Sequence, residues 1–179
     1  MALPDFFKVA LGTPVIWGEA GATGISLTVT NTLSLDNLLN AAGRMGASVD
    51  LGADWDGDYL AQLIFETGTA PTAGLSVELY FAWSHDNTNW PGKVTGSDAA
   101  YPATVAANKL QLGLPAGLLI ATADANTVLR QSPNVIQAKA RYVCPVTINL
   151  LGVGGRNEGT ATNNDSRVVL TPLISKVIE

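Results

Sequence analysis

Glycine and proline interrupt this chain along its whole length, and the apolar runs between them are short. The 18 glycines and 9 prolines are spread through the sequence rather than gathered in one linker. Within the runs, apolar residues often recur at every second position, which is the period of a β-strand with one buried face. The clearest run, residues 75–83 (LSVELYFAW), places four large apolar side chains on one face: Leu75, Val77, Leu79 and Phe81. The chain is therefore expected to fold mainly as β-strands.

Runs of this kind predict eight or nine strands. They lie at residues 25–35, 46–51, 59–66, 75–83, 109–114, 117–122, 127–131, 142–151 and 166–174. Short strands separated by turn signals about every ten residues are typical of an antiparallel sandwich or jelly roll. We therefore expect an all-β fold, an antiparallel β-sandwich or jelly roll of about eight strands, formed as one domain by residues 25–179.

Residues 34–45 (SLDNLLNAAGRM) fit two structures. Ser34 is a suitable N-cap, and apolar residues follow at helical spacing: Leu35, Leu38, Leu39 and Ala42. A turn or two of helix would explain that spacing. A strand that runs into a hairpin at Ala42 and Gly43 would explain it as well, and the neighbouring strands favour the strand.

Residues 1–24 do not fit a closed domain. They are too apolar for a solvated tail, and glycine and proline break them too often for one regular element. An extended N-terminal arm that lies along another subunit explains both features. The residues predicted to form that interface are Phe6, Phe7, Val9, Leu11, Val15, Ile16 and Trp17.

The composition supports shared interfaces and excludes several classes of partner. Charged residues make up only 14% of the chain, against about 25% in an average soluble domain. Such a surface is suited to burial against partners. The net charge of −5 and the scattered Lys and Arg argue against nucleic acid binding.

No apolar run reaches the ~18 residues of a membrane helix and no signal peptide is evident, so we expect a soluble, cytosol-made chain that binds no membrane. The single cysteine, Cys144, is expected to be a buried, inert thiol.

The segment Trp83–Gly92 (WSHDNTNWPG) holds the only histidine, beside an acid. Neighbours on a strand point to opposite faces, so this adjacency does not make a catalytic pair. An exposed hairpin loop, with turns stabilised by Asp86 and Asn87, explains the segment. An alternative is a carbohydrate-binding module that would grip sugar rings with Trp83, Asp86, Asn87, Asn89 and Trp90, while the tryptophans could equally close the end of the sandwich.

The remaining acidic clusters give no active site. Asp54, Asp56 and Asp58 alternate as in a calcium loop, but the glycine and glutamate that an EF-hand needs are misplaced, so calcium remains a weak candidate. Glu66 and Glu78 could face each other, although two solvent-facing strand residues are the preferred interpretation. The glycines at 152–159 lack the Lys-Ser/Thr of a phosphate-binding loop. We expect no enzyme activity and no cofactor.

Four segments in a fixed order carry a resemblance to a known family. They are TLSLDNLLNAAGRMGASVDLG, ETGTAPTAG, LSVELYFAWSHDNTNWPG and VTGSDAAY, which together span about residues 32–101. In this order they resemble small virion structural proteins of tailed bacteriophages. These motifs are turn and strand signatures, and none of them is catalytic.

The resemblance implies a decoration or cement protein on the outer capsid, with a β-sandwich fold and often a trimeric state. The implied partners are the lattice of the major capsid protein and other copies of the chain. The resemblance is also compatible with a component of the tail or fibre base. The implied location is the capsid surface of the virion, after synthesis in the host cytoplasm. Environmental or host glycans are a further expected partner if the exposed loop binds sugar.

Overall fold

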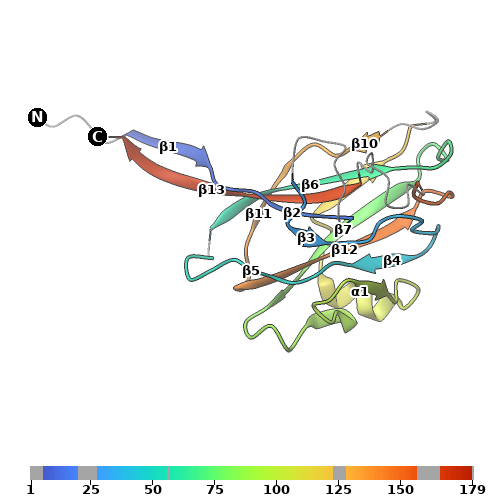
Figure 1. Ribbon diagram of the computed structural model, residues 1–179, viewed down its shortest axis with the longest axis horizontal. Helices are drawn as coiled ribbons and strands as arrows, with labels where there is room; N and C mark the ends of the chain where they lie inside the picture. The colour runs from blue at the N-terminus through green and yellow to red at the C-terminus, as the bar shows by residue number, and fades with distance from the viewer. Residues whose placement is uncertain (1–5, 20–27, 56, 123–127, 157–165, 179) are drawn as a thin grey trace, which may run out of the picture.

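Two β-sheets pack face to face in the computed structural model of the chain (Figure 1). The structure describes residues 6–19, 28–55, 57–122, 128–156 and 166–178. Within that part there are 13 strands and one short α-helix, so the predicted all-β sandwich is confirmed. The strands are more numerous than predicted because several of them are only two to four residues long.

The first sheet has seven strands, in the order β10-β6-β13-β2-β3, and β1 and β11 pair with β13 and β6. All pairs are antiparallel except β2 with β3. Its strands are β1 (Phe6–Leu11), β2 (Val15–Gly18), β3 (Asn31–Thr32), β6 (Asp58–Glu66), β10 (Val128–Arg130), β11 (Asn134–Gln137) and β13 (Arg167–Ile178).

The second sheet has six strands in the order β8-β4-β12-β7-β9, and β5 also pairs with β12. Its strands are β4 (Gly43–Met45), β5 (Val49–Asp50), β7 (Ser76–Ser84), β8 (Ala99–Tyr101), β9 (Gly117–Ile120) and β12 (Tyr142–Leu150). Pro145 is tolerated in the central strand β12 because its backbone faces the break between β4 and β5, where its carbonyl accepts a hydrogen bond from the Gly46 N–H.

The main core lies between the two sheets, and strand alternation selects which side chains enter it. On β7, Val77, Leu79 and Phe81 are buried in this core, as the spacing of residues 75–83 predicts. Leu75, predicted for the same face, lies before the start of β7 and is 40% exposed. Tyr80 and Ala82, which alternate with them, face the other side of the sheet.

A second apolar cluster covers the outer face of the second sheet. Cys144, Val146 and Ile148 of β12 pack there against a cover built from residues 91–112. That cover includes the 3₁₀ turn η1 (Pro91–Lys93), strand β8 and helix α1 (Ala106–Leu112). Burial raises the pKa of the Cys144 thiol to about 12, which confirms the expected buried and inert thiol.

Helix α1 corrects the predicted strand at residues 109–114. Leucines at every second position suggested an alternating strand, but residues 109–112 are the second half of α1, and only Leu112 enters the outer cluster. Leu110 and Leu114 are 78% and 90% exposed. The helix starts without a side-chain N-cap, so the local sequence carries no start signal for it.

The segment 34–45 is neither a helix nor a strand ending in a hairpin. It runs through irregular turns, with Asn37 and Ala41 at positive φ, before β4 begins at Gly43. Leu35 and Leu38 are buried in the main core, whereas Leu39 is exposed. In the predicted strand 25–35, residues 25–27 lie outside the described part, and the rest forms only β3.

The N-terminal segment corrects the predicted arm boundary. Ile16 and Trp17 lie in β2, inside the first sheet, and are 3% and 0% exposed. Val15 packs against the same core. These three residues therefore belong to the sandwich rather than to an arm, and the domain begins at β2 instead of residue 25. Only β1 extends from it, paired with the distal half of β13, and the two strands project together as one ribbon (Figure 1).

Candidate functional site

The terminal ribbon is defined here as β1 together with residues 173–178 of β13. In register, Phe6 pairs with Ile178 and Leu11 with Leu173. Pairing of β13 with β6 ends at Pro172, so among the described residues the ribbon has no third strand. An isolated two-stranded ribbon is marginally stable in water, because it has no sheet or helix against which to bury an apolar face.

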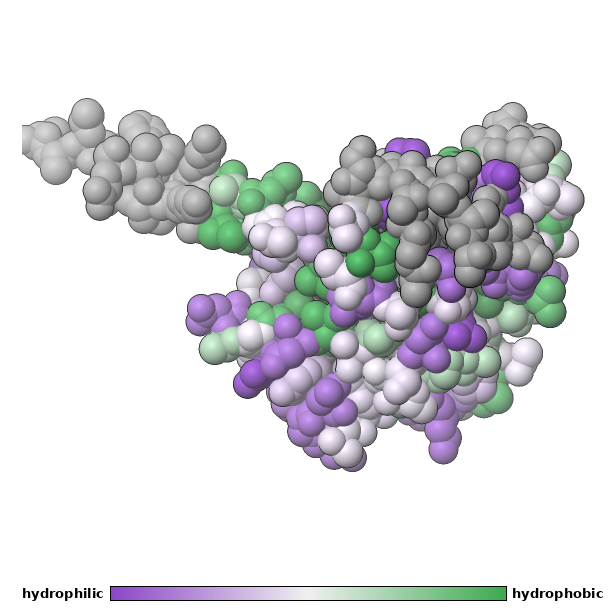
Figure 2. Space-filling view, in the orientation of Figure 1, coloured by the Kyte–Doolittle hydropathy of each residue, from purple (hydrophilic) through white to green (hydrophobic). Residues whose placement is uncertain are grey.

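Apolar side chains lie exposed on both faces of the terminal ribbon. Val9 and Leu11, on one face, are 61% and 66% exposed. Ile174 is opposite Ala10 on the other face and is 41% exposed. Figure 2 shows hydrophobic atoms where the ribbon leaves the sandwich. Exposed apolar residues on a strand with a free edge are typical of a surface that pairs with another chain.

The predicted interface residues thus separate into two groups. Val9 and Leu11 are exposed on the terminal ribbon, while Val15, Ile16 and Trp17 lie in or against the core. The backbones of Phe6 and Phe7 pair with β13, and their side chains lie outside the described part of the chain.

The loop after β7 is organised by Asp86. Its carboxylate accepts hydrogen bonds from the backbone N–H groups of Thr88 (2.9 Å) and Asn89 (2.8 Å). The hydroxyl of Ser84 and the side-chain amide of Asn89 also donate to it. These bonds, led by those from the Asn89 and Thr88 backbone, hold the pKa of the Asp86 carboxyl well below its usual range. Asn87 sits at the turn with φ of 60°. The loop is therefore a rigid exposed turn.

The two tryptophans of this loop do not form one surface. Trp83 packs on the main core, with its ring 6.1 Å from that of Phe81. Trp90 packs on the outer cluster, on the opposite side of the second sheet. It lies against Gly96, whose missing side chain leaves room for the indole. His85 is exposed and makes an edge contact with Trp55. Trp83, Trp90 and the Asp86 turn are thus not brought together around one sugar-sized cavity.

The acidic residues proposed for other chemistry are also separated. Asp54 and Asp58 are exposed, Asp56 lies outside the described residues, and no group of three or more His, Cys, Asp or Glu within those residues could hold a metal ion. Glu66 and Glu78 lie in different sheets, so they do not form a carboxylate pair.

The interpretation of these glutamates as solvent-facing is wrong for Glu66. It is 3% exposed and pairs with Arg156, which also donates its backbone N–H to the Glu66 carbonyl. Glu78 pairs with Lys109 of α1 at 2.5 Å and accepts a hydrogen bond from Tyr80. The ion pair of Glu66 joins β6 to residue 156, and the ion pair of Glu78 joins β7 to α1.

Asp98 is a structural junction that the sequence did not single out. It accepts hydrogen bonds from the Ser34 hydroxyl (2.6 Å) and the Arg44 guanidinium (2.7 Å). Burial by itself raises the pKa of this carboxyl, but the hydrogen bonds from Arg44 and Ser34 outweigh it, so the pKa lies below its usual value. Asp98 thus joins its own loop to Ser34, in the irregular segment, and to Arg44, in β4, across more than fifty positions of sequence.

We expect Asp98→Asn to lower the free energy of unfolding by about 1.5–3 kcal/mol at pH 7, because it removes charge-assisted hydrogen bonds. A lowered folded-state pKa contributes stability that is present above the unfolded value of 3.8 and is lost as the pH falls through the folded value. The difference from the unmodified protein should therefore shrink in urea unfolding below pH 3.8. Asp54→Asn, at an exposed site, is the control and should change stability by less than about 0.5 kcal/mol. Equal effects of the two substitutions would contradict the junction.

Two further apolar surfaces appear only in the folded chain. Around α1, Val105, Leu110 and Leu114 are exposed. At the edge strand β9, Leu118 and Ile120 are 47% and 60% exposed. On sequence alone these leucines and the isoleucine were expected in strands, so only the folded chain shows that they lie exposed around a helix and at a sheet edge.

The structure has no helix, within its described residues, of the length and apolarity needed to span a bilayer. Comparison of the chain with protein-family models, with characterised proteins and with solved structures returns no match.

Proposed function

We propose that this chain is a virion structural protein of the capsid decoration or cement type, which self-associates and binds the outer shell. The observation that carries the proposal is the terminal ribbon. It projects from the sandwich with apolar side chains on both faces and no third strand among the described residues. Such a ribbon gains stability when another protein covers it.

Two other features support this function. The chain has few charged residues, so large parts of its surface can be buried in interfaces without leaving charged side chains unpaired. It also has a separate apolar surface around α1, formed by Val105, Leu110 and Leu114. A cement protein must hold its own copies together and also hold the shell, which requires more than one apolar surface. The family resemblance of residues 32–101 points to the same role.

The test combines solution mass with shell binding. Light scattering over a concentration series should give a closed oligomer, most simply a homotrimer, rather than the 18.6 kDa monomer. The purified oligomer should co-sediment with shells assembled from the major capsid protein encoded in the same genome. Leu110→Asp at the α1 surface should reduce shell binding while leaving the oligomer intact.

A strict monomer that binds no shell would overturn the proposal. An oligomer that binds purified tails but not shells would show that the protein is a component of the tail or fibre base instead.

A further inference from the structure

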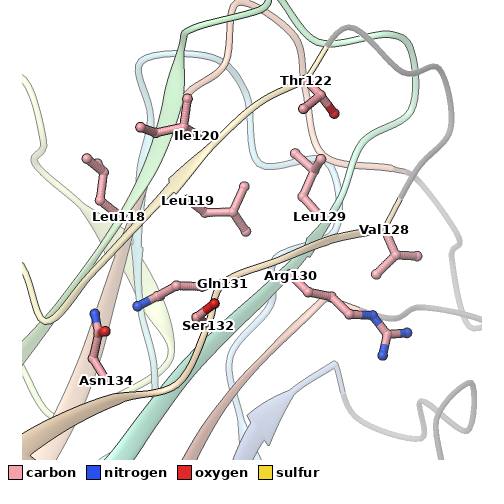
Figure 3. A pocket seen from close by; sticks show the side chains of 10 residues that line it. All are labelled: Leu118, Leu119, Ile120, Thr122, Val128, Leu129, Arg130, Gln131, Ser132 and Asn134. Atoms are coloured by element: carbon pink, nitrogen blue, oxygen red, sulfur yellow. The ribbon is translucent and has the colours of Figure 1, made fainter.

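A groove opens between strands β9 and β10, at the edge of the sandwich (Figure 3). It has a volume of about 500 Å³. One wall is formed by Leu118 and Ile120, and the other by Val128 and Arg130. The walls come from different sheets, since β9 ends the six-stranded sheet and β10 ends the path of the seven-stranded one.

Both walls of the groove are free strand edges. The N–H of Ala121 donates to the carbonyl of Leu75, the residue just before β7, so by alternation the backbone groups of Leu118 and Ile120 point away from β7. The N–H of Gln131 bonds to Leu63 on β6, so those of Val128 and Arg130 point away from β6. No strand among the described residues pairs with either outer edge. The groove is thus prepared to accept backbone hydrogen bonds from an added strand.

An unpaired amide lies inside the groove. Gln131 is 7% exposed, and neither its amide nitrogen nor its amide oxygen has a hydrogen-bond partner. The amide occupies space that only Gly117 leaves open, since a Cβ at that position would lie 2.0 Å from Oε1 of Gln131. A buried polar group without a partner costs about 1–3 kcal/mol. Its donor and acceptor match the C=O and N–H of an extended backbone, which is the ligand class that the free edges also fit.

The terminal ribbon supplies that backbone. It is extended, has free edges, and exposes Val9 and Leu11, which match the exposed Leu118 and Ile120 of the groove.

We propose that the groove between β9 and β10 receives the terminal ribbon of a second copy, whose free strand edge adds to β9 while its backbone engages Gln131. This inference rests on the self-association in the proposed function and names the surface that performs it. The ribbon leaves one end of the molecule, and β10 lies toward the other (Figure 1). The ribbon and the groove are therefore different surfaces, so their contact is a head-to-tail interface, which forms a ring such as a trimer when the rotation between successive copies closes.

Mixed disulfide formation tests the contact directly. The test uses three single variants: Val9→Cys on the terminal ribbon, Ile120→Cys in the groove, and Leu110→Cys on α1 as a matched exposed control. The variants are mixed in pairs under mild oxidation. Native Cys144 is fully buried and does not compete. The ribbon and groove variants should give a mixed dimer in much higher yield than either variant with the α1 control. Preferential linkage of Val9→Cys to Leu110→Cys would overturn the proposal, as would an Ile120→Cys homodimer formed in preference to the mixed one.

A second measurement separates this inference from the proposed function. Gln131→Met removes the unpaired amide, so the monomer should melt at the same or a higher temperature while the dissociation constant rises about tenfold. Ile120→Lys should weaken self-association further, whereas Leu110→Lys should not. If the oligomer forms normally in the Gln131 and Ile120 variants but is lost on deletion of the ribbon, the groove is wrong and self-association stands. If the unmodified chain is monomeric at every concentration, this inference fails, and the proposed function fails with it when the monomer also binds no shell.

Discussion

Replacement of Trp17 by alanine is expected to lower the free energy of unfolding by about 3–5 kcal/mol, the usual cost of removing a large aromatic side chain from a core. Trp17 is fully buried, and its ring centre lies 6.3 Å from that of Phe81 in the opposite sheet. Its indole N–H donates to the Ala47 carbonyl at 2.7 Å. The substitution therefore leaves a cavity between the sheets and a carbonyl without its partner.

Urea unfolding followed by far-ultraviolet circular dichroism measures this effect, because the far-ultraviolet signal of the strands remains available after the tryptophan is removed. Val9→Ala is the matched control, eight positions away on the same N-terminal segment but 61% exposed, and should change stability by less than about 0.5 kcal/mol. A Trp17→Ala protein that keeps its stability and loses only self-association would show that the residue belongs to an intermolecular arm after all.

Deletion of residues 1–11 is expected to abolish self-association while the sandwich still folds. The deletion removes β1, and with it the exposed Val9 and Leu11, but β2 and its core residues remain. The remaining residues 173–178 of β13 lose their strand partner. Light scattering should give the monomer mass, and the thermal melt should stay cooperative, because none of the ribbon side chains that the structure describes lies in the main core.

A longer deletion, of residues 1–20, is the informative comparison. It also removes β2 and Trp17, so the chain should fail to fold cooperatively. A shorter chain, lacking residues 1–11, that keeps the full oligomer mass would exclude the terminal ribbon as the interface. Cooperative folding of the longer deletion would contradict the placement of β2 in the first sheet.

Strand alternation explains why much of the fold could be predicted. The runs at 59–66, 75–83, 142–151 and 166–174 correspond to β6, β7, β12 and β13, which form the centre of the two sheets. Each of these strands is long enough to show its period within its own sequence. The short strands β3 and β5 contain two residues each, too few for any period, so their limits could not be predicted.

Helix α1 and the segment 34–45 show how local patterns mislead. Leu110, Leu112 and Leu114 alternate as strand residues do, but Leu112 of α1 packs on the sheet, while Leu110 of α1 and Leu114 just after it are exposed. The segment 34–45 has helical spacing, yet Asn149 of β12 accepts from and donates to its backbone, which holds it in turns. In both cases contacts with distant strands outweighed a weak local preference.

By itself, the sequence determined the fold class, the central strands and the rigid turn at Asp86, since each depends on residues close together in the chain. Outside the central strands, only the tertiary structure decided which apolar residues form core and which form surface. Trp17 and Val9 belong to the same apolar N-terminal segment, yet one is fully buried and the other 61% exposed. The difference arises because β2 lies beneath a second sheet and β1 has only one neighbouring strand. The burial of a side chain depends on the residues that pack against it. For Trp17, Asp98 and Gln131 those residues come from distant parts of the chain.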